Sequence, residues 1–381
     1  MEPGCRRIKP AMKLKFLVAL IVAANLLQGK TIAVSIGINY FSGLDKKYAD
    51  IKGGDTIILE PGLRGAIQFA NLAGGNNNYI TIINGEGPSE IKSATLPYGI
   101  SLRNCHYIKL CGRGDEKDPY GIKISEVSRD GAGLGISDKS DHIEVCFIEI
   151  CNTKGPGILC KTNPDCVTSR DNFTMVCTSI HHNYVHNTGT EGMYIGSTAY
   201  AGEKIKCDSS SVTRFPPVLD TVEVYENRVS YTGWDGIQIS NAIHVKCYRN
   251  AISFDSQKEE PWQNCGLIIG GGTSGEFSEN TIEHGKGYGI NCFGTGHVGI
   301  AKNSIVMDSS STKVAIYISD KLATKETDYL VYMNTIKTNH YPAITILNKK
   351  GRKPDWVKDN DPGETDLSKA ISFEGVKPNI K

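Results

Sequence analysis

One frame recurs along this sequence and restricts its fold more than any other feature. The frame is an Asn, any residue, Ile or Val, six further residues, then Gly or Ala followed by alternating apolar positions. Ungapped copies begin at Asn183, Asn227, Asn280 and Asn334, and two copies with insertions begin at Asn250 and Asn303. The shortest step between copies is 23 residues and the longer steps contain insertions.

A unit of 23 residues made of short alternating strands and turns, without a helix, is typical of a parallel β-helix. Each coil would stack its apolar positions on the next coil at about 4.8 Å. Leucine-rich repeats have a similar length, but their Leu-x-x-Leu-x-Leu frame is absent here. We therefore expect an all-β chain with a single-stranded β-helix of about 23-residue coils. We interpret the recurrent Asn as a hydrogen-bonded ladder of buried turn residues.

Residues 53–85, "GGDTIILEPGLRGAIQFANLAGGNNNYITIING", resemble the first coils of the secreted right-handed parallel β-helix proteins of the pectin-lyase-like superfamily. Together with the repeats, the resemblance covers roughly residues 40 to 350. It implies a right-handed coil and does not specify an activity, since the superfamily includes lyases, hydrolases, esterases and non-catalytic adhesins.

The start of the chain has the pattern of an export signal. A basic segment precedes an apolar run from Phe16 to Leu27, and small residues follow at Gly29 and Ser35. The run is shorter than the roughly 20 residues that span a bilayer. We predict a signal peptide over 1–35, with Met12 as an alternative start, a β-helix over 36–350 and a polar cap or tail over 351–381. The expected location is secreted or periplasmic.

Charge and cysteine content exclude some classes of function. The formal net charge is +1, so nothing marks the chain as a binder of nucleic acid or, after signal cleavage, of a membrane. There are 12 Cys without a Cys-x-x-Cys pair, which argues against a structural zinc site. Cys111, Cys146, Cys247 and Cys292 fall at strand positions and favour burial, whereas Cys160, Cys166 and Cys177 flank a loop where a disulfide can form.

The largest insertions leave the frame at one turn, so loop insertions gather on one edge. Residues 161–176 and 197–219 follow "GILC" and "GMYI", and a third loop near 319–328 follows "AIYI". Ligand sites in such folds lie on outward residues and between loops. We expect a groove walled by 161–176 and 197–219.

Glu191 and Asp235 occupy the same position in consecutive coils, in "NTGTEGMYIGS" and "YTGWDGIQISN". In stacked coils their Cα atoms would lie about 5 Å apart. That spacing suits a shared calcium ion, two carboxyls sharing one proton, or the nucleophile and acid of a retaining glycosidase. An acid before Gly also caps turns, which is the structural alternative.

Further candidates lie near the two acids. Tyr194 and Gln238 begin an outward column that continues with Ile268, Asn291 and Tyr317, and Trp234 precedes Asp235; these side chains suit sugar binding. His186 is the nearest candidate base. Arg214 and Lys206 on the long loop supply positive charge.

The region around the two acids resembles the motifs of two enzyme families in part. "TEGMYIGS" resembles the N-G-G-E-x-I-R-I-G-x-S stretch of alginate lyases and chondroitinase B, with Glu191 at its acid, but Tyr194 stands in place of its Arg. The layout of "GWDG", "WQNC" and "GYG" is similar to polygalacturonases and keeps Asp235. Gln263, Asn264 and Tyr288 replace the remaining acids and the His of that family.

These observations predict a secreted, monomeric carbohydrate-active protein that cleaves a polysaccharide as a lyase or glycoside hydrolase. Glu191, Asp235 and His186 would be catalytic, and Glu191 and Asp235 are the candidate ligands of calcium. The alternative is a non-catalytic glycan-binding or surface β-helix, in which both acids are turn caps.

Overall fold

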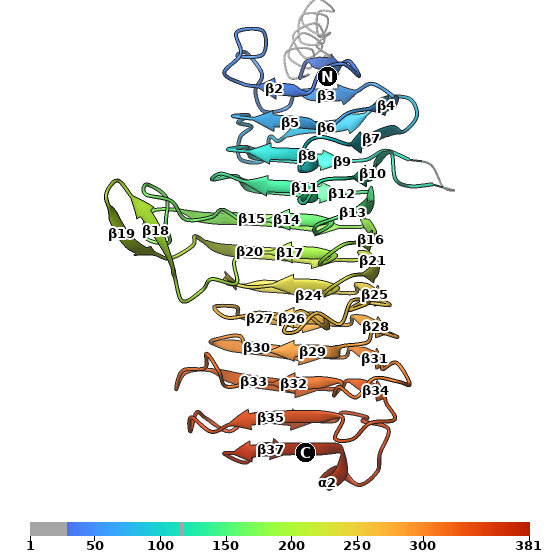
Figure 1. The fold of residues 1–381 in the computed structure, drawn as a ribbon, viewed down its shortest axis with the longest axis vertical. Helices are drawn as coiled ribbons and strands as arrows, with labels where there is room; N and C mark the ends of the chain where they lie inside the picture. Colours follow the sequence, from blue (N-terminus) through green and yellow to red (C-terminus); the bar gives the residue numbers. More distant parts are fainter. Residues whose placement is uncertain (1–28, 115–117) are drawn as a thin grey trace, which may run out of the picture.

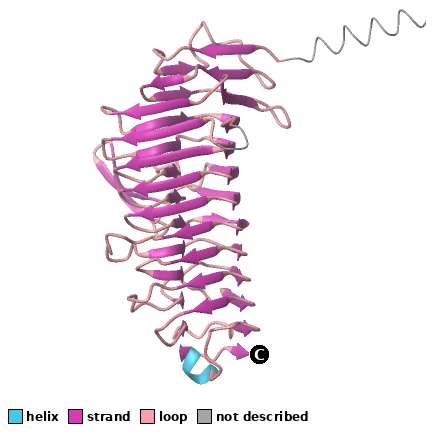
Figure 2. Cartoon of the chain, turned by 90° about the vertical axis from the view of Figure 1, so that its right-hand side faces the viewer, coloured by secondary structure: helices cyan, strands magenta, loops and turns pink. Residues whose placement is uncertain are grey.

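The computed structural model describes residues 29–114 and 118–381, and shows a tall stack of coils with the N-terminal coils at one end and the C-terminus at the other (Figure 1). Nearly every described element is a β-strand, with one short helix near the C-terminus. The strands form three long parallel sheets that run the length of the stack (Figure 2). This confirms the predicted right-handed parallel β-helix.

We name the sheets A, B and C, and most coils contribute one strand to each. Sheet A contains β1 (Thr31–Val34), β3 (Thr56–Leu59), β6 (Ile80–Asn84), β9 (His106–Cys111), β12 (Asp141–Cys146), β15 (Thr174–His181), β20 (Val218–Tyr225), β23 (Ala242–Ile243), β24 (Val245–Tyr248), β27 (Gly275–Ser278), β30 (His297–Ala301), β33 (Asp328–Tyr332), β36 (Trp356–Lys358) and β38 (Asn379–Ile380). Sheet C contains β4 (Gly62–Arg64), β7 (Ser89–Ser93), β10 (Ile122–Val127), β13 (Ile148–Thr153), β16 (Tyr184–Thr188), β21 (Arg228–Thr232), β25 (Ala251–Ser253), β28 (Thr281–Glu283), β31 (Ser304–Val306) and β34 (Thr335–Lys337). Sheet B contains β2 (Tyr40–Ser42), β5 (Ile67–Ala70), β8 (Tyr98–Arg103), β11 (Ala132–Ser137), β14 (Ile158–Cys160), β17 (Met193–Ile195), β22 (Ile237–Ile239), β26 (Cys265–Ile269), β29 (Tyr288–Cys292), β32 (Ile316–Ile318), β35 (Ile344–Asn348) and β37 (Ile371–Gly375).

The core is a set of apolar columns inside the coils. On sheet A, Val224, Cys247, Phe277, Ile300 and Val331 pair in register along successive strands, and all are buried. The alternation in each strand sends these residues inward and their neighbours outward. Since each coil buries its apolar face only against the coils on either side, stability depends on nearest neighbours.

The recurrent asparagines form the predicted ladder at the corner between sheets A and C. Each Oδ1 accepts hydrogen bonds from the backbone N and the Nδ2 of the previous ladder residue, in the order Asn183, Asn227, Asn250, Asn280, Asn303, Asn334 and Asn360. All six ladder residues from Asn183 to Asn334 are buried. The steps are 44, 23, 30, 23, 31 and 26 residues, so each coil adds one rung whatever its length.

Both ends of the β-helix extend beyond the boundaries expected from the sequence. The apolar run of the predicted signal lies outside the described residues, but β1 falls within 1–35 and pairs with β3. At the other end, β36, β37 and β38 continue sheets A and B through 351–381, and α2 (Leu367–Ala370) lies between them. Few residues of this segment face the core, so its sequence is polar. Its strands therefore lack the apolar alternation by which strands are recognised in a sequence.

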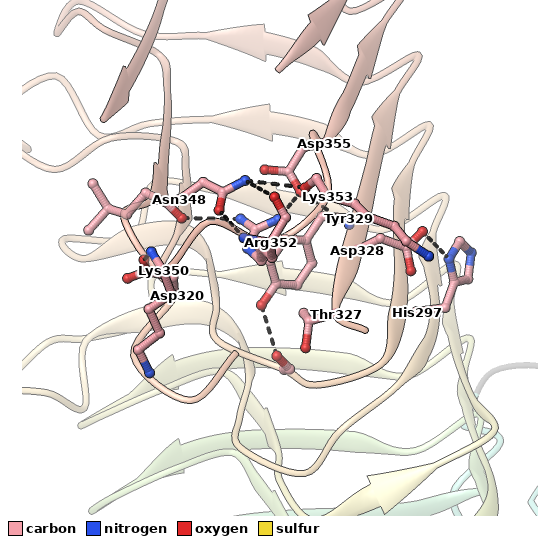
Figure 3. A network of polar contacts seen from close by, with 12 residues as sticks. His297, Asp320, Thr327, Asp328, Tyr329, Asn348, Lys350, Arg352, Lys353 and Asp355 are labelled. Carbon is pink, nitrogen blue, oxygen red and sulfur yellow. Dashed lines mark hydrogen bonds and ion pairs between the residues drawn. The ribbon is translucent and has the colours of Figure 1, made fainter. Parts of the chain in front are cut away.

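A buried polar cluster secures the turn after β35 (Figure 3). Arg352 forms an ion pair with Asp355, both side chains being fully buried, and its guanidinium lies 4.4 Å from the ring centroid of Tyr329. The Tyr329 hydroxyl donates to the Gly294 carbonyl at 2.8 Å. This cluster joins neighbouring coils near the C-terminal end of the stack.

Two disulfides are present among the described cysteines. Cys166 bonds to Cys207, so one of the three loop-flanking cysteines is paired, while Cys160 and Cys177 are free. Cys111 bonds to Cys146, although the sequence favoured simple burial for both. The two residues are directly opposed in β9 and β12, a register that brings side chains from distant sequence positions together.

No helix within residues 29–114 and 118–381 is long and apolar enough to cross a membrane.

Candidate active site on sheet B

The inserted loops gather on one edge, as the repeat frame predicts. Loops 161–173, 196–217 and 319–327 follow β14, β17 and β32, which are all strands of sheet B. The second loop contains the antiparallel hairpin of β18 (Glu203–Cys207) and β19 (Ser210–Arg214), which projects from the stack (Figure 1).

A disulfide fixes two of these loops to each other. Cys166 of the first loop is bonded to Cys207 of the hairpin, and the Arg214 guanidinium donates to the Cys166 carbonyl at 3.5 Å. The Cys166 sulfur also lies 3.6 Å from the carbonyl oxygen of Lys206. The two loops therefore form one wall beside sheet B.

A polar pocket of about 440 Å³ opens between this wall and sheet B. It is lined by Lys161, Asn163, Pro164, Tyr194, Ser197, Thr198, Ala199, Glu203 and Ile205. The Lys161 ammonium lies 4.6 Å from the ring centroid of Tyr194, and the Tyr194 hydroxyl lies 2.8 Å from Thr198 Oγ1. A cation, an aromatic ring and hydroxyl groups thus meet in one concave space.

Glu191 and Asp235 lie at the turn from sheet C into sheet B, in the predicted common register. Met193 pairs with Ile237, and the ladder continues into the turn, where the Gly192 N–H donates to the Asp235 carbonyl at 2.9 Å. The two acids therefore occupy the same position in consecutive coils.

Both carboxyls are more buried than an exposed groove would allow. Glu191 is 3% exposed and Asp235 is 0% exposed. Burial raises the pKa of Glu191, while the positive charge of Lys161 lowers it. Burial, and then the negative charge of Glu191, raise the pKa of Asp235 well above its usual range, against a hydrogen bond from the Cys265 backbone N–H to Oδ1 at 2.8 Å. Both carboxyls therefore ionise at a higher pH than exposed carboxyls do.

A third buried acid, Asp255, belongs to this cluster and was missed in the sequence. It follows Thr153, Thr188 and Thr232 in the column at the end of sheet C, and its charge contributes to the raised pKa of Asp235. Burial raises its own pKa to about 7, although Ser256 Oγ donates to its Oδ1 at 2.7 Å. Extending the repeat frame from Asn250 places Asp255 where earlier coils have Thr, and that substitution was the available signal.

The loop of residues 256–264 covers the turn that carries Asp235. The backbone N–H groups of Ser256, Gln257 and Lys258 donate to the carbonyls of Trp234, Thr232 and Gly233. The Lys258 ammonium donates to the Gly189 carbonyl at 2.6 Å. These contacts account for the burial of Asp235 and leave Trp234 only partly exposed.

Several buried polar atoms of this region have no hydrogen-bond partner within the described chain. They are Asp235 Oδ2, Asp255 Oδ2, Gln238 Nε2, Gln263 Oε1 and Asn291 Oδ1. Gln238 and Asn291 belong to the predicted column Tyr194, Gln238, Ile268, Asn291 and Tyr317, whose register is as expected. Buried polar groups are paired in most proteins, so a concentration of unpaired ones marks a place where a ligand or water supplies the partners.

His186 has a different environment from the two acids. It lies on sheet C, stacked on Tyr184, with Nε2 at 3.2 Å from Glu149 Oε1. Burial disfavours the charged imidazole, but hydrogen bonds to Cys151 and Glu149 raise the pKa of His186 to about 9. A histidine protonated at neutral pH and bonded to a carboxylate is poorly suited to act as a base.

Glu191 and Asp235 offer few oxygen ligands for a calcium ion. Calcium takes about six to eight oxygens, whereas Asp235 Oδ1 already accepts a backbone hydrogen bond. Among the described residues, one group of side chains brings three possible metal-binding atoms close together, and it contains neither Glu191 nor Asp235. These two acids alone therefore do not make a calcium site.

Comparisons with known proteins place the fold. A family model described as a right-handed β-helix region matches residues 218–361. No curated protein matches the sequence. An alginate lyase from Paenibacillus sp. matches with a TM-score of 0.54 and 13% identity, covering 82% of this chain and 97% of that one. A GH136 lacto-N-biosidase from Eubacterium ramulus matches with a TM-score of 0.50 and 11% identity, covering 96% of this chain and 70% of that one. At these identities the likeness establishes a shared fold.

Proposed function

Because this chain is a right-handed parallel β-helix protein with the pectin-lyase-like fold, we propose that it is a secreted, carbohydrate-active enzyme that hydrolyses a glycosidic bond in a polysaccharide. The substrate lies along the outer face of sheet B, beside the wall formed by loops 161–173 and 196–217. The alginate lyase and the lacto-N-biosidase named above both act on carbohydrates, which supports this class of substrate.

The observation that carries the proposal is the pair of stacked, buried carboxyls, Glu191 and Asp235, next to unpaired polar atoms on the same sheet. Hydrolysis of a glycosidic bond needs a carboxylic acid that keeps its proton near neutral pH and a second carboxylate. Burial and mutual repulsion raise the pKa of Asp235 in the required direction. Glu191 is the less buried of the two carboxyls, and the pocket residue Lys161 is among the charges that act on it.

We assign the acid that keeps its proton to Asp235, whose pKa is raised well above its usual range, and the second carboxylate to Glu191 in the preceding coil. Tyr194 and Lys161 would bind sugar at the pocket, whereas Gln238, expected to face outward, is only 1% exposed and does not line the pocket. Arg214 and Lys206 belong to the loop wall and do not line the pocket. The Arg214 guanidinium donates a hydrogen bond to the Cys166 carbonyl.

A non-catalytic glycan-binding protein is the second candidate, and one observation favours it. Asp235 is fully buried, and its Oδ1 accepts the Cys265 backbone N–H, as expected for a turn cap. In that case the pocket would bind sugar and the acids would only hold the turn.

The test incubates the protein with a panel of acidic and neutral polysaccharides and analyses the products by mass spectrometry. Saturated fragments support hydrolysis, unsaturated fragments indicate a lyase, and binding without fragments supports the second candidate. Glu191→Gln should lower turnover by about 100-fold to 10,000-fold, the usual contribution of a general acid or base. Glu279→Gln, an exposed carboxylate at the corner between sheets A and C, is the matched control and should keep full activity.

A further inference from the structure

A second cluster of chemically active side chains lies on sheet A, on strands that take no part in the carboxyl cluster. Cys146, Glu144 and His181 place one ligand atom each within 4.8 Å of one another. Cys111 is joined to Cys146 by the disulfide, so its sulfur is bonded to a member of this group without belonging to the three atoms that lie within 4.8 Å of one another. The register of β9, β12 and β15 sets Cys111, Cys146 and His181 side by side in three consecutive coils.

The spacing of these atoms matches a tetrahedral metal site. Glu144 Oε1 lies 3.3 Å from His181 Nε2 and 3.8 Å from Cys146 Sγ. Zinc binds nitrogen and oxygen at about 2.0 to 2.2 Å and sulfur at about 2.3 Å, so adjacent ligands of a tetrahedron lie roughly 3.3 to 3.8 Å apart. Two thiolates, an imidazole and a carboxylate are a ligand set that zinc accepts.

A hydrogen-bonded chain behind His181 orients its free nitrogen toward this position. His181 Nδ1 lies 2.8 Å from His182 Nδ1, and His182 Nε2 lies 2.7 Å from Glu226 Oε2. Glu226 thus supports His182, and His182 supports His181 through Nδ1. Nε2 is therefore the His181 nitrogen that faces the Glu144 carboxylate. A carboxylate behind a histidine is the usual outer support of a metal-bound imidazole.

In the oxidised protein the Glu144 carboxylate is paired with a lysine. The Lys109 ammonium donates to the same Glu144 Oε1 at 2.6 Å. Because both sulfurs are bonded to each other, they cannot act as thiolate ligands while the disulfide persists.

We propose that reduction of the Cys111–Cys146 disulfide creates a zinc site made of Cys111, Cys146, Glu144 and His181. A dithiol reductant breaks the S–S bond by giving two electrons and two protons, becomes a disulfide itself and leaves two thiols on the protein. Zinc binding releases these two protons to solvent, and the metal displaces Lys109 from Glu144. This site is separate from the proposed carbohydrate site and does not depend on it.

The test uses the whole protein, reduced with dithiothreitol and then separated from the reductant by anaerobic gel filtration. Cobalt(II) is the probe, because tetrahedral thiolate coordination gives a sulfur-to-cobalt charge-transfer band and visible d–d bands, and zinc should displace it. Reduced protein should bind one equivalent, and air-oxidised protein none. Cys146→Ser and His181→Ala should each weaken binding at least tenfold, and Glu226→Gln by about 10-fold to 100-fold through its support of the imidazole.

Matched controls separate this site from other thiols. Cys151→Ser removes a thiol beside His186 on sheet C, and the double variant Cys166→Ser/Cys207→Ser removes the other reducible pair; both should bind cobalt as the wild type does. Far-ultraviolet circular dichroism establishes that each variant is folded. Absence of the charge-transfer band in the reduced wild type, or equal binding by folded Cys146→Ser and His181→Ala, would overturn the proposal.

Discussion

The Oδ1 of Asn250 accepts two hydrogen bonds from Asn227, one from its backbone N at 3.1 Å and one from its Nδ2 at 3.0 Å. Asn250 in turn donates to Asn280 and to the Val224 carbonyl. Asn250→Ala leaves several buried groups unpaired, each worth about 1 to 3 kcal/mol. We expect the free energy of unfolding to fall by at least about 2 kcal/mol, measured by chemical denaturation. Asn39→Ala, at an exposed loop position, should change it little, and equal effects of the two would refute the ladder's role.

Asp255 makes stability depend on pH. Its carboxyl ionises near 3.8 in the unfolded chain, whereas the folded pKa is about 7. Well below pH 3.8 the carboxyl is protonated in both states. Between about pH 4 and 7 it is ionised mainly in the unfolded chain, so the fold loses stability as pH rises. Asp255→Asn removes this loss. We expect the stability of the variant relative to the wild type to grow by up to about 4 kcal/mol between pH 4 and 7. Parallel stability curves across this range would contradict the raised pKa.

Gly192, next to Glu191, is required by close packing. A Cβ at this position would lie 2.3 Å from Val229 Cγ1 and 2.6 Å from the Gly236 carbonyl oxygen. Gly192→Ala should therefore destabilise the fold by about 2 kcal/mol or more, as overpacking does in cores. Gly135→Ala is the matched control on the same sheet, since a Cβ there meets nothing within 4 Å. Comparison of the two melting temperatures decides the prediction.

The Cys166–Cys207 disulfide is expected to order the loop wall without carrying the fold. Cys166→Ser/Cys207→Ser should make the hairpin more sensitive to trypsin at Lys204 and Lys206, because local opening of the loops becomes easier. The melting temperature should change by only a few degrees, since the sheets lie outside this loop pair. Unchanged cleavage at both lysines would show that the hairpin is ordered by other contacts.

The fold was readable from the sequence because every coil repeats the same local chemistry. The Asn frame predicted the hydrogen-bonded ladder. Because the insertions all begin at the same turn of the frame, they predicted the edge on which loops 161–173, 196–217 and 319–327 lie. The last coil was not recognised, because Asn360 and β36 to β38 lie in a polar segment without the apolar alternation.

The candidate site was readable only in part. Register alone gave the pairing of Glu191 with Asp235, but their burial depends on the 256–264 loop folding back over an earlier coil, which no local pattern encodes. His186 was chosen for its position in the sequence, and its bond to Glu149 comes from the preceding coil. Contacts between coils thus decide the electrostatics that the sequence leaves open.

The asparagine ladder has a consequence for how such a molecule changes over time. Successive rungs are separated by as few as 23 and as many as 44 residues, yet every coil advances the stack by the same single hydrogen-bonded step. The number of residues inserted beside sheet B is therefore independent of the height of the column. Loops can be lengthened, shortened or exchanged between related genes without disturbing the corner that holds consecutive coils together, so ligand preference can diverge while the scaffold stays constant.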